Sequence, residues 1–338
     1  MTAPFQLSND SSRVLPTIES HLAALSKDNP ELEDLAKLIG IIAATAIPLG
    51  QRLALGAIPG NPAALVGTNE SGDAQKALDV AAHDLYIRAL RAGSVRSVLS
   101  EEAEDIVDLN PEGRYNVAID PIDGSGSIGI GAPLGVLFCI FPSDDGFLRS
   151  GRDILAAGYI SFGHASDIAF SMGRGVTIAT LDHRIGTFCI VDQGWKMPLE
   201  SPMLAYNASN TGVWSGGLQR YVADCLAGKK GPRGRSFNMR WLGAAVGDLH
   251  RIVRQGGIFL YPGDRRPGYE KGRLRLLYEV FPIAYIIEQA GGAATDEQGP
   301  VLDRIPESHH EHAPLIFGSR AEMQVLHSYL DQNLNGEF

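Results

Sequence analysis

The residues best suited to chemistry lie at positions 115–127, where an apolar run ends in two carboxylates. The run Tyr-Asn-Val-Ala-Ile-Asp-Pro-Ile-Asp places Asp120 and Asp123 at the tip of a predicted strand, and Gly-Ser-Gly-Ser follows at 124–127. Carboxylates at the end of a buried strand are ligands that hard cations such as Mg²⁺ prefer. The following loop offers backbone N–H groups and hydroxyls that can bind a phosphate. An ordinary turn is the alternative, because Asp, Pro and Gly are also the usual turn residues.

A second acid pair favours the functional interpretation. Residues 95–99 form another short apolar run, and this run ends on Ser100, Glu101 and Glu102. Two strands would then bring four acids together. A cluster of carboxylates repels itself and is stable only if cations bind it or some of its groups are protonated. The pattern therefore indicates a site for divalent metal and phosphate.

The elements that must position these acids are helices and strands in a mixed chain. Helix signals include Asp73 as an N-cap and Gly93 as a stop, and strands without long helices between them predict a largely antiparallel sheet in the first half. A polar segment rich in Gly, Lys and Arg is interpreted as a mobile loop. The expected helices are 35–46, 73–92, 243–254, 282–290 and 321–332, the expected strands are 134–141, 155–162, 168–172, 175–181, 187–191, 258–261 and 314–317, and the loop is 227–236.

Composition sets limits on partners and compartment. The chain has 338 residues, of which 44% are hydrophobic and 20% are charged, as in a globular protein with a sizeable core. A formal net charge of -10 argues against nucleic acid or an anionic membrane as the main partner. No signal peptide and no run long enough to span a bilayer is recognisable, so a cytoplasmic location is expected. The cysteines are expected to be buried free thiols, at positions Cys139, Cys189 and Cys225.

Six motifs in order resemble those of the class I fructose-1,6-bisphosphatase family, within the lithium-sensitive, metal-dependent sugar phosphatases. The resemblance covers most of the chain. The motifs are Gly-Asp-Ala-Gln-Lys-Ala-Leu-Asp-Val at 72–80, Ser-Glu-Glu at 100–102, Asp-Pro-Ile-Asp-Gly-Ser at 120–125, Ala-Ala-Gly-Tyr at 156–159, Gly-Gly-Ile-Phe-Leu-Tyr-Pro at 256–262 and Arg-Leu-Arg-Leu-Leu-Tyr-Glu at 273–279.

This resemblance implies a metal site and a water-activating group. It implies two or three Mg²⁺ ions per subunit, with Mn²⁺ or Zn²⁺ as substitutes, and a metal-activated water that attacks the phosphorus. Glu102, with Asp73 as its partner, would orient and deprotonate that water, and Asp79 would support the water network. The implied metal ligands are the carboxylates of Glu101, Asp120, Asp123 and Glu279 and the backbone carbonyl of Ile122.

The resemblance also implies a pocket for a second, distal phosphate, which needs charge-assisted hydrogen bonds. The family's arginine at position 240 reaches across a subunit interface, so the resemblance implies a homo-oligomer, either a dimer or a tetramer. The implied substrate-binding residues are Gly124 and Ser125 in the loop, and Asn207, Arg240, Tyr261, Arg273 and, more peripherally, Arg275.

The departures from the family pattern concern this pocket. Residues 125–129 read Ser-Gly-Ser-Ile-Gly where the family usually has Ser-Ser-Asn-Ile-Asp. Two family tyrosines are replaced by Asn210 and Trp241, and the pocket lysine is replaced by Arg273. Arg is longer than Lys and bidentate, so the pocket should be reshaped. A six-carbon or a seven-carbon substrate therefore remains open.

Two further segments bear on regulation and metal binding. The places that bind AMP in the family correspond to Asn29-Pro30-Glu31, Arg114-Tyr115 and Pro142, which lack the family's threonine and arginine, so inhibition by AMP should be weak or absent. A histidine group between two prolines could bind a transition metal, but the segment is interpreted as an exposed loop. Its members are His309, His310 and His312.

Three functions are compatible with these residues. The leading one is Mg²⁺-dependent removal of the 1-phosphate of fructose 1,6-bisphosphate, in gluconeogenesis or the Calvin cycle, with sedoheptulose 1,7-bisphosphate as a second candidate substrate. The alternatives are an inositol-monophosphatase-like or 3'-nucleotide phosphatase and a non-catalytic sugar-phosphate sensor. The expected fold is an α/β (α+β) layered sandwich with two sheets interleaved with helix layers. The expected domains are 1–200, with most metal ligands, and 201–338, with the distal pocket and Glu279, and the boundary lies near 198–206.

Overall fold

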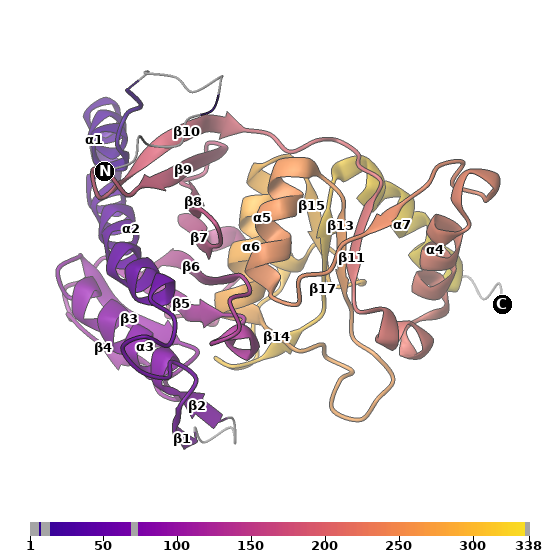
Figure 1. Ribbon diagram of the computed structural model, residues 1–338, viewed down its shortest axis with the longest axis horizontal. Helices are drawn as coiled ribbons and strands as arrows, with labels where there is room; N and C mark the ends of the chain where they lie inside the picture. Colours follow the sequence, from indigo (N-terminus) through magenta and orange to yellow (C-terminus); the bar gives the residue numbers. More distant parts are fainter. Residues whose placement is uncertain (1–6, 8–13, 69–73, 335–338) are drawn as a thin grey trace.

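The computed structural model describes residue 7, residues 14–68 and residues 74–334. Their helices and strands form five layers in the order helices, sheet, helices, sheet, helices (Figure 1). Three apolar clusters of buried side chains fill the four spaces between the layers, the largest of them around the central helices. This arrangement confirms the predicted sandwich of two sheets interleaved with helix layers.

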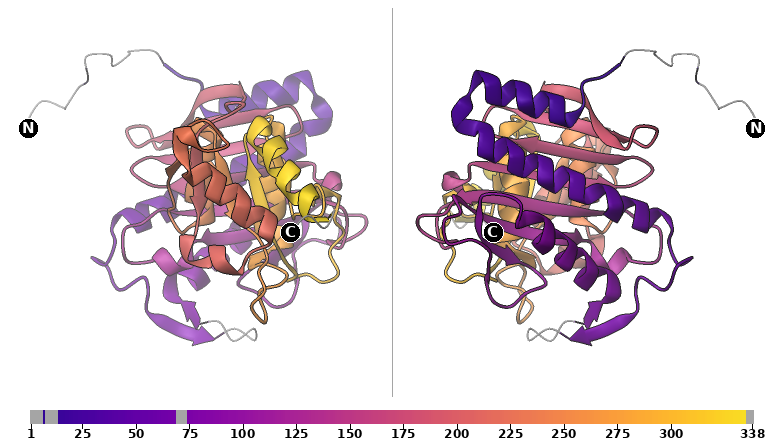
Figure 2. Two further views of the ribbon diagram at one scale, coloured as in Figure 1. Left: turned by 90° about the vertical axis from the view of Figure 1, so that its right-hand side faces the viewer. Right: turned by 90° about the vertical axis from the view of Figure 1, so that its left-hand side faces the viewer.

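The first layer consists of three helices that cover the outer face of the first sheet (Figure 2, right). Their bounds are α1 Ile18–Asp28, α2 Glu33–Ala54 and α3 Ala77–Leu90. The buried residues of α2 recur every three or four positions from Leu35 to Leu49, which gives the helix one apolar face. The predicted end of this helix at residue 46 is wrong. Pro48 lies on the exposed side, where water can bond the carbonyl group that loses its helical donor.

The start predicted for the next helix, near Asp73, is also wrong. Residues Ala74–Lys76 form strand β2, which pairs with β1, Leu65–Thr68, and helix α3 begins only at Ala77. The Asp79 carboxylate accepts a hydrogen bond from the backbone N–H of Lys76 at 3.1 Å, so Asp79 takes part in capping this helix. Asp73 itself lies outside the described residues.

The second layer is an eight-stranded sheet with the order β10-β9-β8-β7-β6-β5-β3-β4. All neighbouring pairs are antiparallel except β3 and β5, which run parallel, as the sequence pattern predicts for this half. The strands are β3 Val95–Ser100, β4 Val107–Asp108, β5 Tyr115–Asp123, β6 Leu134–Pro142, β7 Ala156–Phe162, β8 Ser166–Ser171, β9 Val176–Asp182 and β10 Thr187–Trp195.

Helices α5, Ala245–Gln255, and α6, Phe281–Gln289, form the central layer between the two sheets (Figure 1). Their side chains belong to one apolar cluster that also contains residues from both sheets. A π-helical turn, Leu276–Val280, leads directly into α6. The two sheets therefore share a core. The π-helical turn that precedes α6 is buried in it.

The second sheet has the order β12-β11-β13-β17-β15 and mixes parallel with antiparallel pairs. Helices α4, Gly216–Leu226, and α7, Arg320–Leu334, cover its outer face (Figure 2, left). The strands are β11 Met203–Tyr206, β12 Asn238–Met239, β13 Ile258–Tyr261, β15 Ala293–Thr295 and β17 Leu315–Gly318, and a separate short pair consists of β14 Leu274–Arg275 and β16 His312–Ala313.

The segment 227–236 differs from the loop expected there, because it is bonded to the core. Glu322 of α7 is 1% exposed and accepts hydrogen bonds from the Arg233 guanidinium at 2.8 and 3.0 Å and from the Arg235 guanidinium at 2.6 Å. The Tyr221 hydroxyl donates a further bond to it at 2.5 Å. A buried carboxylate needs such partners. The sequence pattern missed them because Glu322 is far away along the chain.

Two smaller expectations were tested by the described residues. Cys139, Cys189 and Cys225 are buried and free, as predicted. Among the helices that the structure describes, none has the length and apolarity to cross a bilayer.

Candidate active site

Asp120 and Asp123 reach the same point because strand β5 carries a bulge between them. Residues an odd number of positions apart on a regular strand point to opposite faces. Opposite β6, however, Asp120 pairs with Leu137 and Asp123 pairs with Gly135, so three steps on β5 match two on β6. The extra residue turns the strand and brings both carboxylates to one side. The Ile122 N–H donates to the Asp120 carboxylate at 2.8 Å and fixes this geometry.

Glu279 approaches from the other half of the chain, on the π-helical turn before α6. The backbone N–H of Arg275 donates to its carboxylate at 2.5 Å. One carboxylate oxygen from each of Asp120, Asp123 and Glu279 lies within 4.8 Å of the others, and all three residues are buried. π-Helical turns inside helices are frequent at functional sites because the extra residue redirects a side chain.

The electrostatics of this cluster fit a cation site. Burial raises the pKa of Asp120 well above its usual range, and neighbouring Glu101, Asp123 and Glu279 raise it further. Burial likewise raises the pKa of Glu279, with Glu101 and Asp123 adding to the effect. The oxygens around one octahedral Mg²⁺ lie about 3 to 4 Å apart. The clustered oxygens are thus close enough for one divalent cation to contact them and to relieve the repulsion between these carboxylates.

Glu101 belongs to the same cluster. It follows β3, and its backbone N–H donates to the Ile119 carbonyl at 3.1 Å, next to the strand that carries Asp120. Burial raises the pKa of Glu101 to about 7, although a hydrogen bond with Asp120 opposes the rise. The Glu101 and Asp120 carboxyl groups therefore lie within hydrogen-bonding range of each other. Four of the predicted acids, from two strands and one π-helical turn, are brought together.

Glu102 is half-buried beside this cluster and is oriented by a residue that the sequence analysis missed. The Gln75 side-chain amide donates to the Glu102 carboxylate at 3.2 Å and also to the Glu102 backbone carbonyl at 3.2 Å. Glu102 also adds to the rise of the Glu101 pKa, after burial, so the two carboxylates face a common region. The signal in the sequence was the position of Gln75 inside the 72–80 motif.

The loop after Asp123 is shaped by glycine. Gly124 has φ +86°, and a Cβ atom there would lie 2.7 Å from the Cβ atom of Ala244. Ser125 is exposed, and the Lys76 ammonium group donates to its backbone carbonyl at 2.5 Å. Opposite the loop, the Val246 N–H in the first turn of α5 donates to Asp123 at 2.7 Å. This helix start favours negative charge at the site.

Asp79, in the first turn of α3, has one carboxylate oxygen without a partner among the described residues. The side chain is 3% exposed, and its second oxygen has no hydrogen-bond partner among the described residues. Burial raises its pKa, and the hydrogen bond from Lys76 opposes this. A buried carboxylate oxygen without a protein donor needs an ordered water molecule.

The residues predicted for the distal phosphate are only partly assembled in one chain. Tyr261 is half-buried, and its pKa is raised by burial, lowered by Arg273 and raised again by Glu279, so it lies in electrostatic range of both groups. Arg273 is exposed. The described side-chain hydrogen bonds of Asn207 and Arg240 are local: the Asn207 amide oxygen accepts from the Ser209 N–H, and the Arg240 guanidinium donates to the Met239 carbonyl.

Trp241 holds the segment beside Arg240 in place. Its ring stacks on Phe259 with 5.4 Å between the ring centroids and lies tilted against Tyr261 at 6.0 Å. Where a tyrosine would offer a hydroxyl, this chain packs the Trp241 ring against two other aromatic rings.

The histidine segment has a structural role that sequence reasoning missed. His310 is half-buried, and its two ring nitrogens lie 2.9 Å from the Tyr278 hydroxyl and 3.0 Å from the Glu104 carbonyl. The Arg275 guanidinium donates to the His310 carbonyl at 2.8 Å. The interpretation as an exposed loop is therefore wrong for His310, which braces the π-helical turn of Glu279.

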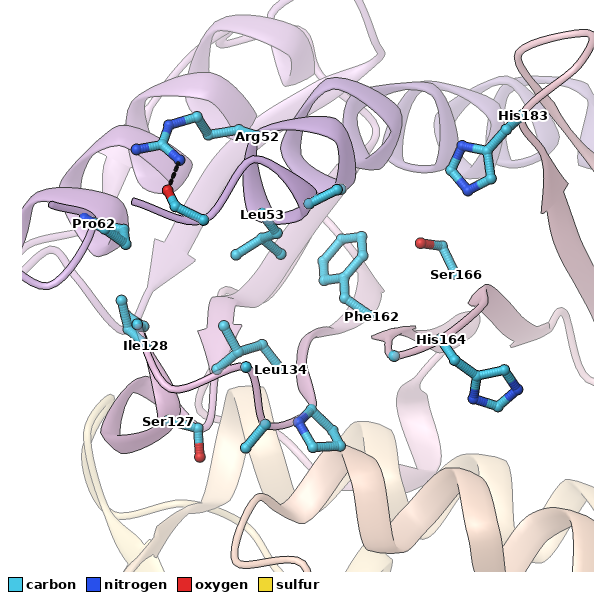
Figure 3. A pocket seen from close by; sticks show the side chains of 18 residues that line it. Arg52, Leu53, Pro62, Ser127, Ile128, Leu134, Phe162, His164, Ser166 and His183 are labelled. Atoms are coloured by element: carbon cyan, nitrogen blue, oxygen red, sulfur yellow. Dashed lines mark hydrogen bonds between the residues drawn. The ribbon is translucent and has the colours of Figure 1, made fainter. Parts of the chain in front are cut away.

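A cavity of about 410 Å³ borders the site without containing it (Figure 3). It shares the segment 127–134 with the loop, but none of the clustered carboxylates lines it. Its labelled side chains include the apolar Leu53, Leu134 and Phe162 (Figure 3). We locate the chemistry at the carboxylates, because the charge that must be compensated lies there.

Comparison with known proteins agrees with this geometry. A family model described as the N-terminal domain of fructose-1-6-bisphosphatase matches residues 30–193, and one described as the C-terminal domain matches residues 197–331. Proteins named fructose-1,6-bisphosphatase class 1 from Brucella suis biovar 1 (strain 1330) and Brucella abortus (strain S19) are each 48% identical over 330 residues, which is 97% of this chain and 97% of theirs. The crystal structure of Leishmania major fructose-1,6-bisphosphatase in holo form has a TM-score of 0.86 and 28% identity and covers 94% of this chain and 100% of its own. The chain therefore belongs to the class 1 fructose-1,6-bisphosphatase family.

Proposed function

We propose that this protein is an enzyme that hydrolyses the 1-phosphate of fructose 1,6-bisphosphate to give fructose 6-phosphate and phosphate. The observation that supports this most strongly is the convergence of buried carboxylates from β5 and from the π-helical turn within 4.8 Å. Glu102 beside them supplies a base that a mere binding protein does not need. A sugar-phosphate sensor is the less favoured alternative for this reason.

The metal ligands in this proposal are Glu101, Asp120, Asp123 and Glu279, with the backbone carbonyl of Ile122. Two or three Mg²⁺ ions, for which Mn²⁺ or Zn²⁺ can substitute, would neutralise charge on the phosphoryl group and lower the pKa of a bound water molecule. The chain's own contribution is to hold these carboxylates together despite their repulsion, through the bulge in β5 and the hydrogen bonds to Asp123 and Glu279.

Proton removal is assigned to Glu102. The amide of Gln75 holds the Glu102 carboxylate by a hydrogen bond, and we propose that this carboxylate accepts the proton of the attacking water. Asp73 would assist it, as in the family. Asp79 would act through a water molecule at its unused oxygen, which the structure leaves without a protein donor among the described residues.

The reacting phosphate is assigned to Gly124 and Ser125, whose loop faces the cluster, and the distal phosphate to the remaining predicted residues. The Arg273 guanidinium, near Tyr261, is the cation placed to bind it. Asn207 and Arg240 would complete the pocket. Because Arg240 is exposed and its guanidinium bonds only a neighbouring carbonyl among the described contacts, we propose that it reaches the site of a second copy in a homodimer or homotetramer.

The organisation and the setting of the enzyme are also proposals. The strands of the first sheet end at Trp195 and those of the second begin at Met203, which favours domains at 1–200 and 201–338. Three free buried thiols suit a reducing compartment, which favours the cytoplasm.

Sedoheptulose 1,7-bisphosphate is a second candidate substrate, because Trp241 and Arg273 alter the pocket. With fructose 1,6-bisphosphate as its substrate, the enzyme would act in gluconeogenesis or the Calvin cycle.

The test is phosphate release with Mg²⁺ from three substrates: fructose 1,6-bisphosphate, sedoheptulose 1,7-bisphosphate and inositol 1-phosphate. We expect the bisphosphates to be preferred. Glu102→Gln should abolish most turnover, whereas the control Asp105→Asn, which changes an exposed acid three residues away, should not. Turnover of the monophosphate alone would favour an inositol-monophosphatase-like activity. No phosphate release from any of the three substrates would favour the sugar-phosphate sensor.

A further inference from the structure

Arg273 is held by an aromatic ring that none of the predicted roles includes. Its guanidinium carbon lies 4.6 Å from the centroid of the Tyr269 ring. Among the described residues it makes no hydrogen bond and no ion pair, so its N–H groups are available to a ligand. A guanidinium on an aromatic ring keeps its donors at the edge while one face is covered. Contact with the ring therefore restrains Arg273 without using the groups that a phosphate would bind.

The same ring also contacts Arg266, whose charge is already compensated. The Arg266 guanidinium carbon lies 4.5 Å from the ring centroid. Its nitrogens donate to the Asp264 carboxylate at 2.9 and 2.5 Å. Two cations thus share the ring, and within the described part of the chain only Arg266 of the two has an ion-pair partner. Asp264 compensates the charge of Arg266. The positive charge left for a ligand is therefore that of Arg273, the residue expected to bind the distal phosphate.

Backbone hydrogen bonds hold the loop that carries the Tyr269 ring. The Tyr269 N–H donates to the Arg266 carbonyl, and the Tyr269 carbonyl accepts from the N–H groups of Asp264 and Gly272, each at 3.0 Å. The loop is tied to the body of the protein through Arg265, whose guanidinium donates to the Trp214 carbonyl at 2.9 Å. The backbone of Tyr269 is therefore part of a hydrogen-bonded loop that is tied to the body of the protein.

From this arrangement we propose that Tyr269 is a positioning residue that holds the Arg273 guanidinium ready for the distal phosphate of a sugar bisphosphate. The proposal rests on the proposed function. A free arginine loses side-chain entropy when a ligand fixes it. Tyr269 limits that loss before the substrate arrives, and so it acts on affinity and not on the chemical step. This chain's arginine at position 273, in place of the family's lysine, is the residue that can stack in this way.

The test compares Tyr269→Leu, which keeps an apolar side chain without a π-face, with Tyr269→Phe, which keeps the ring. Tyr269→Leu should raise KM for fructose 1,6-bisphosphate about three- to tenfold with little change in kcat, and Tyr269→Phe should keep the wild-type KM. The inhibition constant of fructose 6-phosphate, which carries only the distal phosphate, should rise by the same factor as KM. In an Arg273→Ala background, Tyr269→Leu should add no further increase.

Three results would overturn the proposal: an unchanged KM in Tyr269→Leu, an equal loss in Tyr269→Phe, or a full additional effect in the Arg273→Ala background. Each of these, with a wild-type enzyme that hydrolyses the bisphosphate, would leave the proposed function intact. A wild-type protein that fails to hydrolyse either bisphosphate would overturn both.

Discussion

The carboxylate cluster predicts that Mg²⁺ stabilises the protein more strongly as the pH rises. Burial raises the pKa of Glu101 to about 7 from an ordinary 4.5 and that of Asp123 to about 6 from an ordinary 3.8. A carboxyl group with a raised pKa binds its proton more tightly in the folded state. Its stabilising contribution is complete below the pKa of the unfolded chain and is lost as the pH rises through the folded pKa.

The size of this loss follows from the two raised pKa values. Between about pH 5.5 and about pH 8, the metal-free protein loses about 2 kcal/mol through Glu101 and about 1 kcal/mol through Asp123. For a chain of this length, about 3 kcal/mol corresponds to about 4 °C in Tm. Bound Mg²⁺ replaces the protons as the compensating charge, so the holoprotein should escape this loss.

Thermal unfolding of the EDTA-treated protein, with and without added Mg²⁺, measures the effect at both pH values. The matched control is the double variant Glu101→Gln, Asp123→Asn, which shares every other titratable group with the wild type. The wild type should lose about 4 °C more than the control between the two pH values when metal is absent, and added Mg²⁺ should abolish this extra loss. Equal pH dependence in the metal-free wild type and control would refute the reasoning.

Three further predictions concern other parts of the chain. Glu102→Gln should lower kcat about 100-fold while the Mg²⁺-induced rise in Tm stays, and a decrease of only a few fold would show that Glu102 is not the base. Glu322→Gln should lower the free energy of unfolding in urea by about 3 to 5 kcal/mol, because the largely buried Arg233 and the partly exposed Arg235 lose the buried carboxylate that they share. The exposed Glu200→Gln should change that free energy by less than about 1 kcal/mol. AMP should leave turnover unchanged even at about 1 mM, since the Arg114 guanidinium already bonds Asp34 at 2.8 Å and Pro142 has no donor; inhibition in the micromolar range would contradict this.

Most strands of the first sheet could be predicted from the sequence because they are largely apolar runs bounded by turn residues, whereas the two-residue strand β4 has no such run and was not predicted. The acids could be found for a similar reason: Asp120, Asp123 and Glu101 directly follow or end such runs. These runs do not determine the register in which neighbouring strands pair. The bulge that turns Asp120 and Asp123 to one side exists only in the pairing of β5 with β6. Local patterns therefore predicted which residues form the site but not how they converge.

Contacts between distant segments account for most of what the sequence analysis missed. Helix α3 starts late because Ala74–Lys76 pair with β1, an interaction that outweighs the local N-cap signal at Asp73. Gln75 is recognisable as a partner of Glu102 only once β2 lies next to the end of β3. His310 likewise gained its role from Tyr278, on the π-helical turn. In each of these cases, tertiary contacts override a local preference.

The divided origin of the carboxylates has a consequence for the order of synthesis. Asp120 and Asp123 are translated long before Glu279, and the apolar cluster around α5 and α6 draws residues from both halves of the chain. While the ribosome extends the second half, the first sheet has one face without its packing partner and an incomplete set of acids. The complete set of acids and the burial of that face therefore both depend on the segment of the π-helical turn and α6, which is synthesised after the whole first sheet.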